Sequence, residues 1–262
     1  KMKKIGIVGC GRVFNHYLKI FKKRAKKDYE IRAVCDIKKK LAKKFSKKLK
    51  CDFYTNFKKM LKINQGKLDL IIILSPSGLH FEHSKLALEN NFNVLCEKPV
   101  TMIPRDALIL QKLSRKKRLM LGVVFQNRFN KSIQTLKKFY KKGKFGKILI
   151  VNVRLLWSRF QNYYNDEWHG TWKKDGGVTN QQAIHHIDVA RWLFGPIKEV
   201  NCIMSNQINK LQAEDTNNAL LRFKSGAVGS IQATTSVRPN DLTASLEVIG
   251  EKGYMVIGGI AL

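Results

Sequence analysis

The first half of the chain alternates short apolar runs with amphipathic segments, and this alternation constrains the fold more than any other feature. The run DLIIILSPS at 69–77 has the length and the continuous apolar character of a buried strand. Similar runs occupy 4–9, 29–36 and 92–99, with helical apolar spacing between them. Strands that are apolar on both faces and alternate with helices indicate a parallel sheet covered by helices on both sides. The expected helices span 12–27, 37–49, 80–91 and 104–117, and a further strand spans 119–125.

The second half of the chain has a different periodicity, in which apolar and polar residues alternate. Glycine-bearing turns such as KSGA and GEKG join these segments, as in an antiparallel sheet with one face in solvent. One helix is expected at 182–195, because Gly195 followed by Pro196 is typical of a helix end. The alternating segments span 147–157, 197–205, 217–226, 227–236 and 243–259.

The predicted fold class is therefore α/β, in two domains. Residues 1–122 form a parallel-sheet domain, and residues 123–262 form an α+β domain with a large, mostly antiparallel, open-faced sheet. Because the last residues, MVIGGIAL, break off within an expected strand, we expect the second domain to be truncated at its C-terminus. The five cysteines are scattered and no secretory signal precedes the first strand, so we expect reduced thiols and a cytoplasmic location.

The formal net charge of +31 arises from 50 Lys and Arg residues against 19 Asp and Glu residues. Such a charge is typical of proteins that bind nucleic acid or an anionic membrane surface. The lysines, however, gather on expected helix faces such as 38–50, without interleaved aromatic residues or a helix-turn-helix or zinc-finger pattern. No apolar run is long enough to span a bilayer. We therefore expect no nucleic-acid and no membrane partner, and we expect the positive field to favour anionic small ligands.

A glycine-rich turn, GCGRVF, follows the first expected strand and opens the first expected helix. Gly9 and Gly11 permit a tight turn and a close approach of the backbone to a pyrophosphate at the helix N-terminus. The third glycine of the usual GxGxxG pattern is Phe14 here, which weakens the motif. Asp36, at the end of the second strand, can accept hydrogen bonds from ribose hydroxyls and disfavours a 2′-phosphate, so NAD is favoured over NADP. Asp36 could also cap the following helix, and Lys38 to Lys40 leave room for NADP.

The stretch VLCEKPV delivers two opposite charges, Glu97 and Lys98, at the end of an apolar strand that stops at Pro99. The carboxyl ends of parallel strands face the ligand crevice, so both side chains would emerge beside a bound dinucleotide. On spacing alone, a solvated ion pair at a strand end explains them as well.

Four motifs, GxG, SPSGLH, EKP and HHIDVARWLFG, resemble in type and order those of the Gfo/Idh/MocA family (glucose–fructose oxidoreductase, inositol dehydrogenase and relatives). The resemblance covers essentially the whole chain and is strongest at CEKPV and at GGVTNQQAIHHIDVARWLFG, residues 176–195. The stretches FQNRF, WHGTW and TTSVRPNDLTASLEVIGEKG resemble the branch associated with bacterial surface-polysaccharide sugars. The resemblance implies a Rossmann domain followed by an open-faced sheet domain.

The resemblance also implies residue roles. Lys98 lies beside the reacting hydroxyl as orienter or proton donor, and His185 is the proton acceptor of an H-x-x-D pattern that ends at Asp188. With the glycine-rich turn and Asp36 included, the candidate cofactor-binding residues are Gly9, Gly11, Arg12, Val13, Phe14, Asp36, Ser75, Pro76, His80, Glu97 and Lys98. The candidate substrate-binding residues are Lys98, Gln126, Asn127, Arg128, Trp168 and Asp188.

The chain departs from the family pattern one helical turn before the catalytic histidine. Family members commonly carry an Asp there, whereas this chain has Gln181. Glutamine can hydrogen-bond the imidazole or the substrate but cannot stabilise an imidazolium by charge, so Lys98 could carry the proton instead of His185. The neighbouring His186 points about 100° away around a helix and is expected to pack or to form a hydrogen bond rather than to react.

Other candidates leave two explanations open. Trp168, His169 and Trp172 could form the wall of a sugar site or could be core aromatic residues. Arg159 and Arg238 could hold a carboxylate or phosphate, or could be ordinary surface arginines. No His, Cys or Asp cluster has metal-ligand spacing, and hydride transfer to nicotinamide needs no metal.

The resemblance predicts an NAD-dependent dehydrogenase acting on CH–OH, which oxidises a secondary hydroxyl of a sugar or nucleotide sugar, as a UDP-N-acetyl-glucosaminuronate 3-dehydrogenase does. The alternatives are an inositol or polyol dehydrogenase and a non-catalytic dinucleotide-binding protein, the latter supported by Phe14 and Gln181. A homo-oligomer that forms through the second-domain sheet is the expected assembly.

Overall fold

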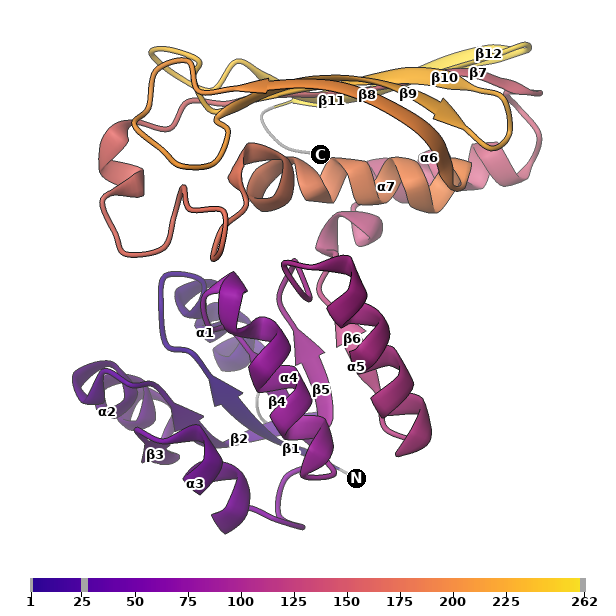
Figure 1. Ribbon diagram of the computed structural model, residues 1–262. Coiled ribbons are helices and arrows are strands. Elements are labelled where there is room, and N and C mark those ends of the chain that lie inside the picture. The colour runs from indigo at the N-terminus through magenta and orange to yellow at the C-terminus, as the bar shows by residue number, and fades with distance from the viewer. Residues whose placement is uncertain (1, 25–27, 260–262) are drawn as a thin grey trace. The chain divides into compact units, whose positions relative to one another are not determined.

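The computed structural model describes residues 2–24 and 28–259 (Figure 1). Contacts divide the chain into two compact units, one up to Val124 and one from Phe125 onward. The predicted fold class is confirmed, because a parallel α/β unit is followed by a unit with a mixed, mostly antiparallel sheet. Among the described residues, no helix is long and apolar enough to cross a bilayer.

The first unit is built on six parallel strands in the order β3-β2-β1-β4-β5-β6. β1 pairs with β2 on one side and with β4 on the other. Strands β2 and β3 are therefore added on one side of β1, and β4, β5 and β6 are added on the other. In open parallel sheets, ligands bind beyond the carboxyl ends of the strands at the position where the strand order reverses in this way. The strands are β1 (Lys3–Val8), β2 (Tyr29–Cys35), β3 (Asp52–Tyr54), β4 (Leu70–Ile73), β5 (Asn93–Cys96) and β6 (Leu121–Val123).

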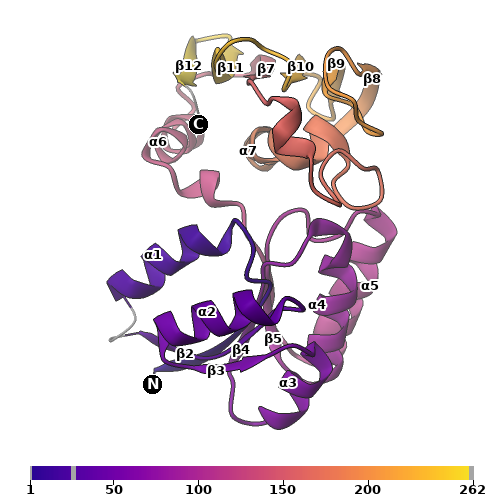
Figure 2. The same cartoon turned by 90° about the vertical axis from the view of Figure 1, so that its left-hand side faces the viewer.

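Helices cover both faces of this sheet, with α1 and α2 on one face and α3, α4 and α5 on the other (Figure 2). On the first face the fully buried rings of Phe14 and Phe45 meet at 4.3 Å between centroids. Met60 and Leu110 are fully buried on the second face, and each such side chain contributes about 1.5–3 kcal/mol. The helices are α1 (Phe14–Arg24), α2 (Lys39–Leu49), α3 (Phe57–Ile63), α4 (His80–Glu89) and α5 (Pro104–Lys116), with a 3-10 turn η1 (Ser77–Leu79) before α4.

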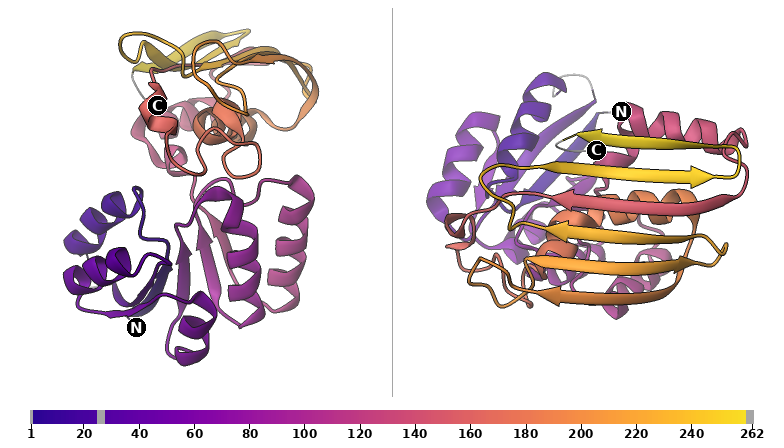
Figure 3. Two further views of the ribbon diagram at one scale, coloured as in Figure 1. Left: turned by 60° about the vertical axis from the view of Figure 1, so that its left-hand side comes forward. Right: turned by 90° about the horizontal axis from the view of Figure 1, so that it is seen from above.

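The second unit is a six-stranded sheet in the order β12-β11-β7-β10-β9-β8 (Figure 3). All neighbours are antiparallel except β7 and β10, which run parallel. The strands are β7 (Ile148–Leu156), β8 (Ile197–Ser205), β9 (Thr216–Phe223), β10 (Val228–Thr234), β11 (Thr243–Gly250) and β12 (Gly253–Gly259). The helical elements are η2 (Gln126–Phe129), α6 (Lys131–Lys141), η3 (Gln161–Tyr164), the π-helical turn η4 (Thr179–Ala183) and α7 (Ile184–Phe194).

Helices α6 and α7 pack on one face of this sheet, and the right panel of Figure 3 looks onto the other face. Inward-facing Leu155, Leu246 and Val248 are fully buried beneath α7. The outward face leaves Leu220 67% and Tyr254 76% exposed. The sheet is therefore one-sided, as its alternating sequence pattern predicts.

The end of α7 follows from local chemistry. Gly195 adopts φ +90 after Phe194, a conformation that glycine takes without a Cβ penalty, and its N–H donates to the Arg191 carbonyl. The start of this helix differs from the expectation, because the π-helical turn Thr179–Ala183 precedes α7 and carries Gln181.

Besides the short turns η1, η2, η3 and η4, the elements that were not anticipated are β3, α3 and α6. Two of them are short, with three residues in β3 and seven in α3. The predicted helix at 12–27 is observed as α1, which ends at Arg24 in the described part of the chain; residues 25–27 lie outside the described residues.

Candidate functional site

Four chain segments meet at the carboxyl edge of the first sheet. Gly9 and Gly11 follow β1, Asp36 follows β2, Ser75 follows β4, and the pair Glu97–Lys98 follows β5. The register of the parallel pairs β1–β2, β1–β4 and β4–β5 brings these strand ends side by side. The structure therefore collects in one place the cofactor-binding candidates that lie 89 positions apart in sequence, from Gly9 to Lys98 (98 minus 9).

The glycine-rich turn combines one tightly packed glycine with one open glycine. Gly9 has φ +94, and a Cβ there would lie 2.4 Å from the carbonyl carbon of Leu74, so only glycine fits. A Cβ on Gly11 would meet no atom within 4 Å. Packing within the protein therefore does not demand glycine at position 11, whereas close approach of a pyrophosphate does, and the turn fits a dinucleotide. Phe14 fills the third-glycine position as a fully buried residue of the core.

Asp36 is bonded to this turn. Its Oδ2 accepts a hydrogen bond from the backbone N–H of Cys10 at 2.8 Å, and its Oδ1 accepts one from the N–H of Lys38 at 2.8 Å. The alternative role as helix cap is wrong, because the N-cap of α2 is Lys38 and makes no side-chain cap bond. Each carboxylate oxygen has a second lone pair, so the group can still accept from ribose hydroxyls.

The two charged residues of the EKP motif, Glu97 and Lys98, are not a simple solvated ion pair. Glu97 Oε1 accepts a hydrogen bond from the Tyr17 hydroxyl on α1 at 2.7 Å, and Glu97 Oε2 lies 3.2 Å from the backbone nitrogen of Lys98. Both Glu97 and Lys98 are half-buried, and the Lys98–Pro99 peptide is cis. Burial, with Glu97 as the next cause, raises the pKa of Tyr17, so its hydroxyl remains a donor.

His80, at the start of α4, joins the strand ends of β4 and β5. Its buried ring lies between two carbonyl oxygens, with Nδ1 2.6 Å from Pro99 O and Nε2 2.8 Å from Ser75 O. Burial lowers the pKa of His80, although both carbonyl oxygens act in the opposite direction. His83 lies one turn further along α4, and its Nδ1 is 3.0 Å from the Ser75 hydroxyl. Both histidines thus tie the segment after β4 to α4.

In the second unit, His185 lies in the first turn of α7 and Gln181 in the preceding π-helical turn. His185 is half-buried, and its ring and the Phe125 ring form a T-shaped pair with centroids 6.1 Å apart. His186 is only 1% exposed, and its ring nitrogens have no hydrogen-bond partner among the described residues. Burial lowers the pKa of His186 to about 4, so it packs as a neutral ring, as expected.

Two residues predicted to face substrate are bonded to each other. Arg128 Nε donates to Asp188 Oδ2 at 2.7 Å, and Arg128 Nη2 donates to Oδ1 at 2.6 Å. The guanidinium carbon also lies 5.1 Å from the centroid of the Trp192 ring. This bidentate pair fastens η2, which contains Gln126 and Asn127, to α7 one turn after His185.

The remaining aromatic and arginine candidates have partners of their own. His169 is buried, with Nδ1 2.6 Å from Asp166 Oδ2, and the Trp168 ring lies 3.6 Å away between centroids. Arg159 forms an ion pair with Asp241 at 2.9 Å. Arg238 Nη2 donates to the side chain of Asn209, and Arg238 lies over the Phe160 ring. Trp172 is the exposed member of the group, at 53%.

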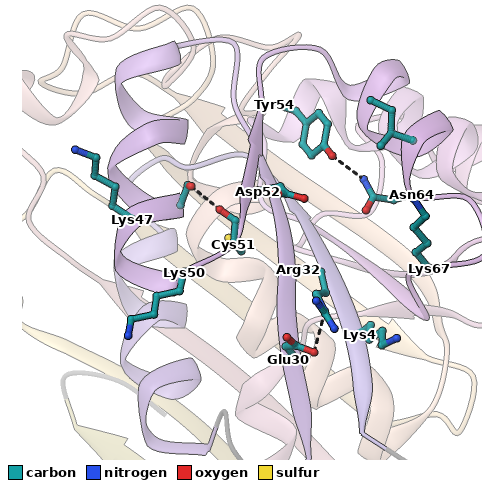
Figure 4. Close-up of a pocket in the computed structure, with 12 residues that line it drawn as sticks. Lys4, Glu30, Arg32, Lys47, Lys50, Cys51, Asp52, Tyr54, Asn64 and Lys67 are labelled. Carbon is teal, nitrogen blue, oxygen red and sulfur yellow. Dashed lines mark hydrogen bonds and ion pairs between the residues drawn. The ribbon is translucent and has the colours of Figure 1, made fainter.

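A separate cavity of about 590 Å³ lies away from these strand ends (Figure 4). It includes Lys4 near the start of β1 and Asp52 at the start of β3, so it opens at the amino ends of the strands. Figure 4 shows Glu30 paired with Arg32, and Lys47 and Lys50 at the end of α2. Basic residues are favoured at helix C-termini whether or not a ligand binds. The lysines of this cavity therefore do not by themselves indicate a ligand site, and the candidate site is the carboxyl edge of the sheet.

Sequence reasoning did not identify Tyr17 as part of the site, because its partner Glu97 lies 80 residues away and no local pattern predicts the contact. Within the described part of the chain, no group of three or more His, Cys, Asp or Glu residues could hold a metal ion.

Comparisons with known proteins cover both units. Residues 3–125 match the oxidoreductase family with an NAD-binding Rossmann fold, and residues 133–256 match the GFO/IDH/MocA C-terminal domain. The WlbA dehydrogenase of Chromobacterium violaceum, solved in complex with NADH and UDP-GlcNAcA, is 35% identical with a TM-score of 0.96, over 99% of this chain and 75% of that chain. The WlbA dehydrogenase of Bordetella pertussis, in complex with the same two ligands, is 32% identical with a TM-score of 0.95, over 100% of this chain and 77% of that chain.

Two curated relatives are less similar to this chain. D-glucoside 3-dehydrogenase of Escherichia coli is 29% identical over 76% of this chain, and the match spans 56% of that protein. An uncharacterized oxidoreductase of Synechocystis is 28% identical over 78% of this chain and is matched over 58% of its own length. The chain thus spans somewhat more than half the length of these relatives. With both halves matched and the first unit an NAD-binding Rossmann domain, the chain belongs to the GFO/IDH/MocA oxidoreductase family.

Proposed function

We propose that this chain oxidises a secondary hydroxyl of a nucleotide sugar, with a UDP-N-acetylhexosaminuronate as substrate and NAD as hydride acceptor. The observation that carries the proposal is the cluster at the carboxyl edge of the first sheet, where the open Gly11 turn, Asp36 and Lys98 follow β1, β2 and β5. Two structures that are 35% and 32% identical hold NADH and UDP-GlcNAcA, which supports the substrate class. The net charge of +31 favours an anionic substrate of this kind.

The cofactor residues of the proposal are those of the first unit. Gly9 and Gly11 admit the pyrophosphate, and Asp36 accepts hydrogen bonds from the adenosine ribose and repels a 2′-phosphate. The remaining proposed cofactor contacts are Arg12, Val13, Phe14, Ser75, Pro76, His80, Glu97 and Lys98. When bound, NAD supplies the electrophilic carbon that accepts hydride.

The proposed substrate chemistry requires a group that orients the hydroxyl and a group that takes its proton. Lys98 orients the hydroxyl through its ammonium group, and His185 on α7 accepts the proton. Gln181 lies in the turn before His185 and offers an amide at the position where the family resemblance implies a carboxylate in most members and an amide in some that act on nucleotide-sugar uronates. A neutral amide leaves the imidazolium without a charge partner at that position, so Lys98 is the alternative proton carrier. Gln126, Asn127 and Trp168 remain proposed substrate contacts, and Arg128 and Asp188 would act while paired with each other.

The test is incubation of the full-length protein with NAD and a panel of UDP-sugars, UDP-sugar uronates and polyols, followed by mass spectrometry. Loss of two hydrogens from one UDP-sugar uronate supports the proposal. Lys98→Met should abolish the reaction while NADH titration still shows binding, and Lys112→Met, which removes an exposed lysine of α5, is the matched control. Oxidation of polyols alone would favour the inositol dehydrogenase alternative, for which relatives that are 21–28% identical are found.

A non-catalytic dinucleotide-binding protein is the second candidate, and Gln181 is the residue that favours it. Stoichiometric NADH binding without oxidation of any compound in the panel would support this candidate. Gln181→Asp restores the family carboxylate one turn before His185. If that variant oxidised a sugar that the parent protein leaves unchanged, the missing carboxylate would explain the inactivity.

The proposed assembly is a homo-oligomer that forms through the open face of the second sheet. This face carries a shallow cavity of about 650 Å³ that includes Val200, Leu220 and Val228. Apolar side chains exposed over several strands favour association. Light scattering on the full-length protein should give a mass above that of one chain, and Leu220→Glu should lower it.

A further inference from the structure

We propose that Tyr17 is a positioning residue for Lys98, acting through the carboxylate of Glu97. This inference rests on the proposed function, because it concerns how the side chain that would orient the substrate is itself oriented. It adds a residue that none of the sequence motifs includes and that lies on α1, three positions after Phe14.

The contact between Tyr17 and Glu97 is short and connects distant parts of the chain. The Tyr17 hydroxyl donates to Glu97 Oε1 at 2.7 Å across 80 residues. A hydrogen bond to an ionised acceptor is stronger than one between neutral groups, and partial burial strengthens it further. Since the other Glu97 oxygen lies against the backbone nitrogen of Lys98, the carboxylate is fastened on both sides.

The segment on the far side of Lys98 is also anchored. The Pro99 carbonyl lies 2.6 Å from Nδ1 of the buried His80. Lys98 therefore lies between two residues whose polar groups are held, Glu97 by α1 and Pro99 by α4. The backbone on either side of Lys98 has little freedom, and this restricts the directions in which its side chain can point.

The position of Tyr17 also connects Lys98 to the dinucleotide turn. The N–H of Tyr17 bonds to the carbonyl of Val13, so Tyr17 belongs to the first turn of the helix that the glycine-rich loop opens. The same turn of α1 thus meets both the loop after β1 and the carboxylate after β5. A shift of that turn when a dinucleotide binds would be transmitted to Glu97 and from there to Lys98.

The variant Tyr17→Phe removes only the hydroxyl and retains the ring contact with Phe21, whose centroid is 5.8 Å away. Tyr29→Phe is the matched control. Tyr29 also packs on Phe21, at 5.7 Å, and its hydroxyl also donates one hydrogen bond, but to the Ile20 carbonyl and not to a strand-end carboxylate. A difference between the two variants therefore reports on Glu97 rather than on loss of a tyrosine hydroxyl in general.

The first measurement needs no substrate. Acylation of the Lys98 amine at pH 8 is followed by peptide mass spectrometry, with Lys98→Arg to identify the peptide. Without the Tyr17 hydroxyl, Glu97 is held on one side only, so the Lys98 side chain samples more directions and its amine meets the reagent more often. We expect Tyr17→Phe to speed the labelling of Lys98 by about threefold or more and Tyr29→Phe to leave it unchanged. An unchanged or slower rate in Tyr17→Phe overturns the inference.

The second measurement uses the substrate that the panel identifies. Tyr17→Phe should lower kcat about tenfold and change KM less than about twofold, because positioning acts on the reacting geometry rather than on binding. In a Glu97→Gln background the same substitution should change kcat less than about twofold, since its effect passes through the carboxylate. Additive effects of the two substitutions contradict the inference. If the parent protein oxidises no sugar, the proposed function fails and the labelling rates still decide the role of Tyr17.

Discussion

Alanine substitutions at each of the two glycines of the dinucleotide turn should distinguish an effect on stability from an effect on cofactor binding. Gly9→Ala places a Cβ 2.4 Å from the Leu74 carbonyl carbon and the Ser75 backbone nitrogen, at a φ of +94. Gly11→Ala places a Cβ in open space, and its φ lies outside the left-handed region. The two positions are two residues apart, so each variant is the other's control.

The expected magnitudes follow from these geometries. At Gly9, a left-handed backbone costs a residue with a Cβ about 1–2 kcal/mol, and overpacking against backbone atoms adds about 1–3 kcal/mol. The sum, about 2–5 kcal/mol, corresponds to a fall in Tm of about 4–20 °C for a chain of this size. At Gly11, alanine should leave the free energy of unfolding within about 1 kcal/mol or raise it slightly. A methyl group at Gly11 would instead weaken NADH binding about tenfold or more, because it occupies the space that the pyrophosphate needs.

Thermal unfolding followed by circular dichroism and fluorescence titration with NADH measure the two effects. A Gly9→Ala protein that melts with the parent would refute the close approach between the turn and the segment after β4. A Gly11→Ala protein that binds NADH as tightly as the parent would show that the dinucleotide does not pass over this glycine.

Three further outcomes are expected. Asp188→Asn should lower the free energy of unfolding by about 1–2 kcal/mol in urea titrations, and adding Arg128→Gln should cost little more, because the two side chains form one bidentate pair that is partly exposed. The pKa of buried His186 is lowered to about 4, so the unfolded chain binds more protons between pH 6.5 and 4 and the free energy of unfolding falls on acidification. His186→Leu should remove about 2 kcal/mol of that fall, as measured in urea titrations at pH 7 and 4.5. Dialysis against EDTA should leave sugar oxidation unchanged in the mass-spectrometric assay, because hydride transfer to nicotinamide requires no metal.

Elements with a sustained apolar pattern were predictable from sequence. The alternation at 197–205 coincides with β8, and the continuous apolar run at 69–77 contains β4. β3 and α3 were missed because three and seven residues are too few to establish a period, and three of the seven residues of α3 are lysines. The parallel pairing of β7 with β10 was also beyond local patterns, because both orientations use the same alternation of side chains.

The candidate site also combines motifs that were predictable from sequence with contacts that were not. The glycine turn, Asp36 and the EKP motif are local signals, and topology brings them to one edge of the sheet. Contacts between motifs were not predictable from spacing. The Arg128–Asp188 pair spans 60 residues, and the partners of both side chains depend on how η2 packs on α7.

The central position of β7 in the second sheet has a consequence for biosynthesis. β7 pairs only with β10 and β11, and Ser230 of β10 lies 78 residues after its neighbour Asn152. At a translation rate of about 5–20 residues per second, both edges of β7 stay without a partner for roughly 4–16 s after it leaves the ribosome. An apolar strand with two open edges is a template for pairing with other chains. A strand that lies inside the finished sheet is therefore the segment of the nascent chain that most needs a chaperone or a rapid supply of its partners.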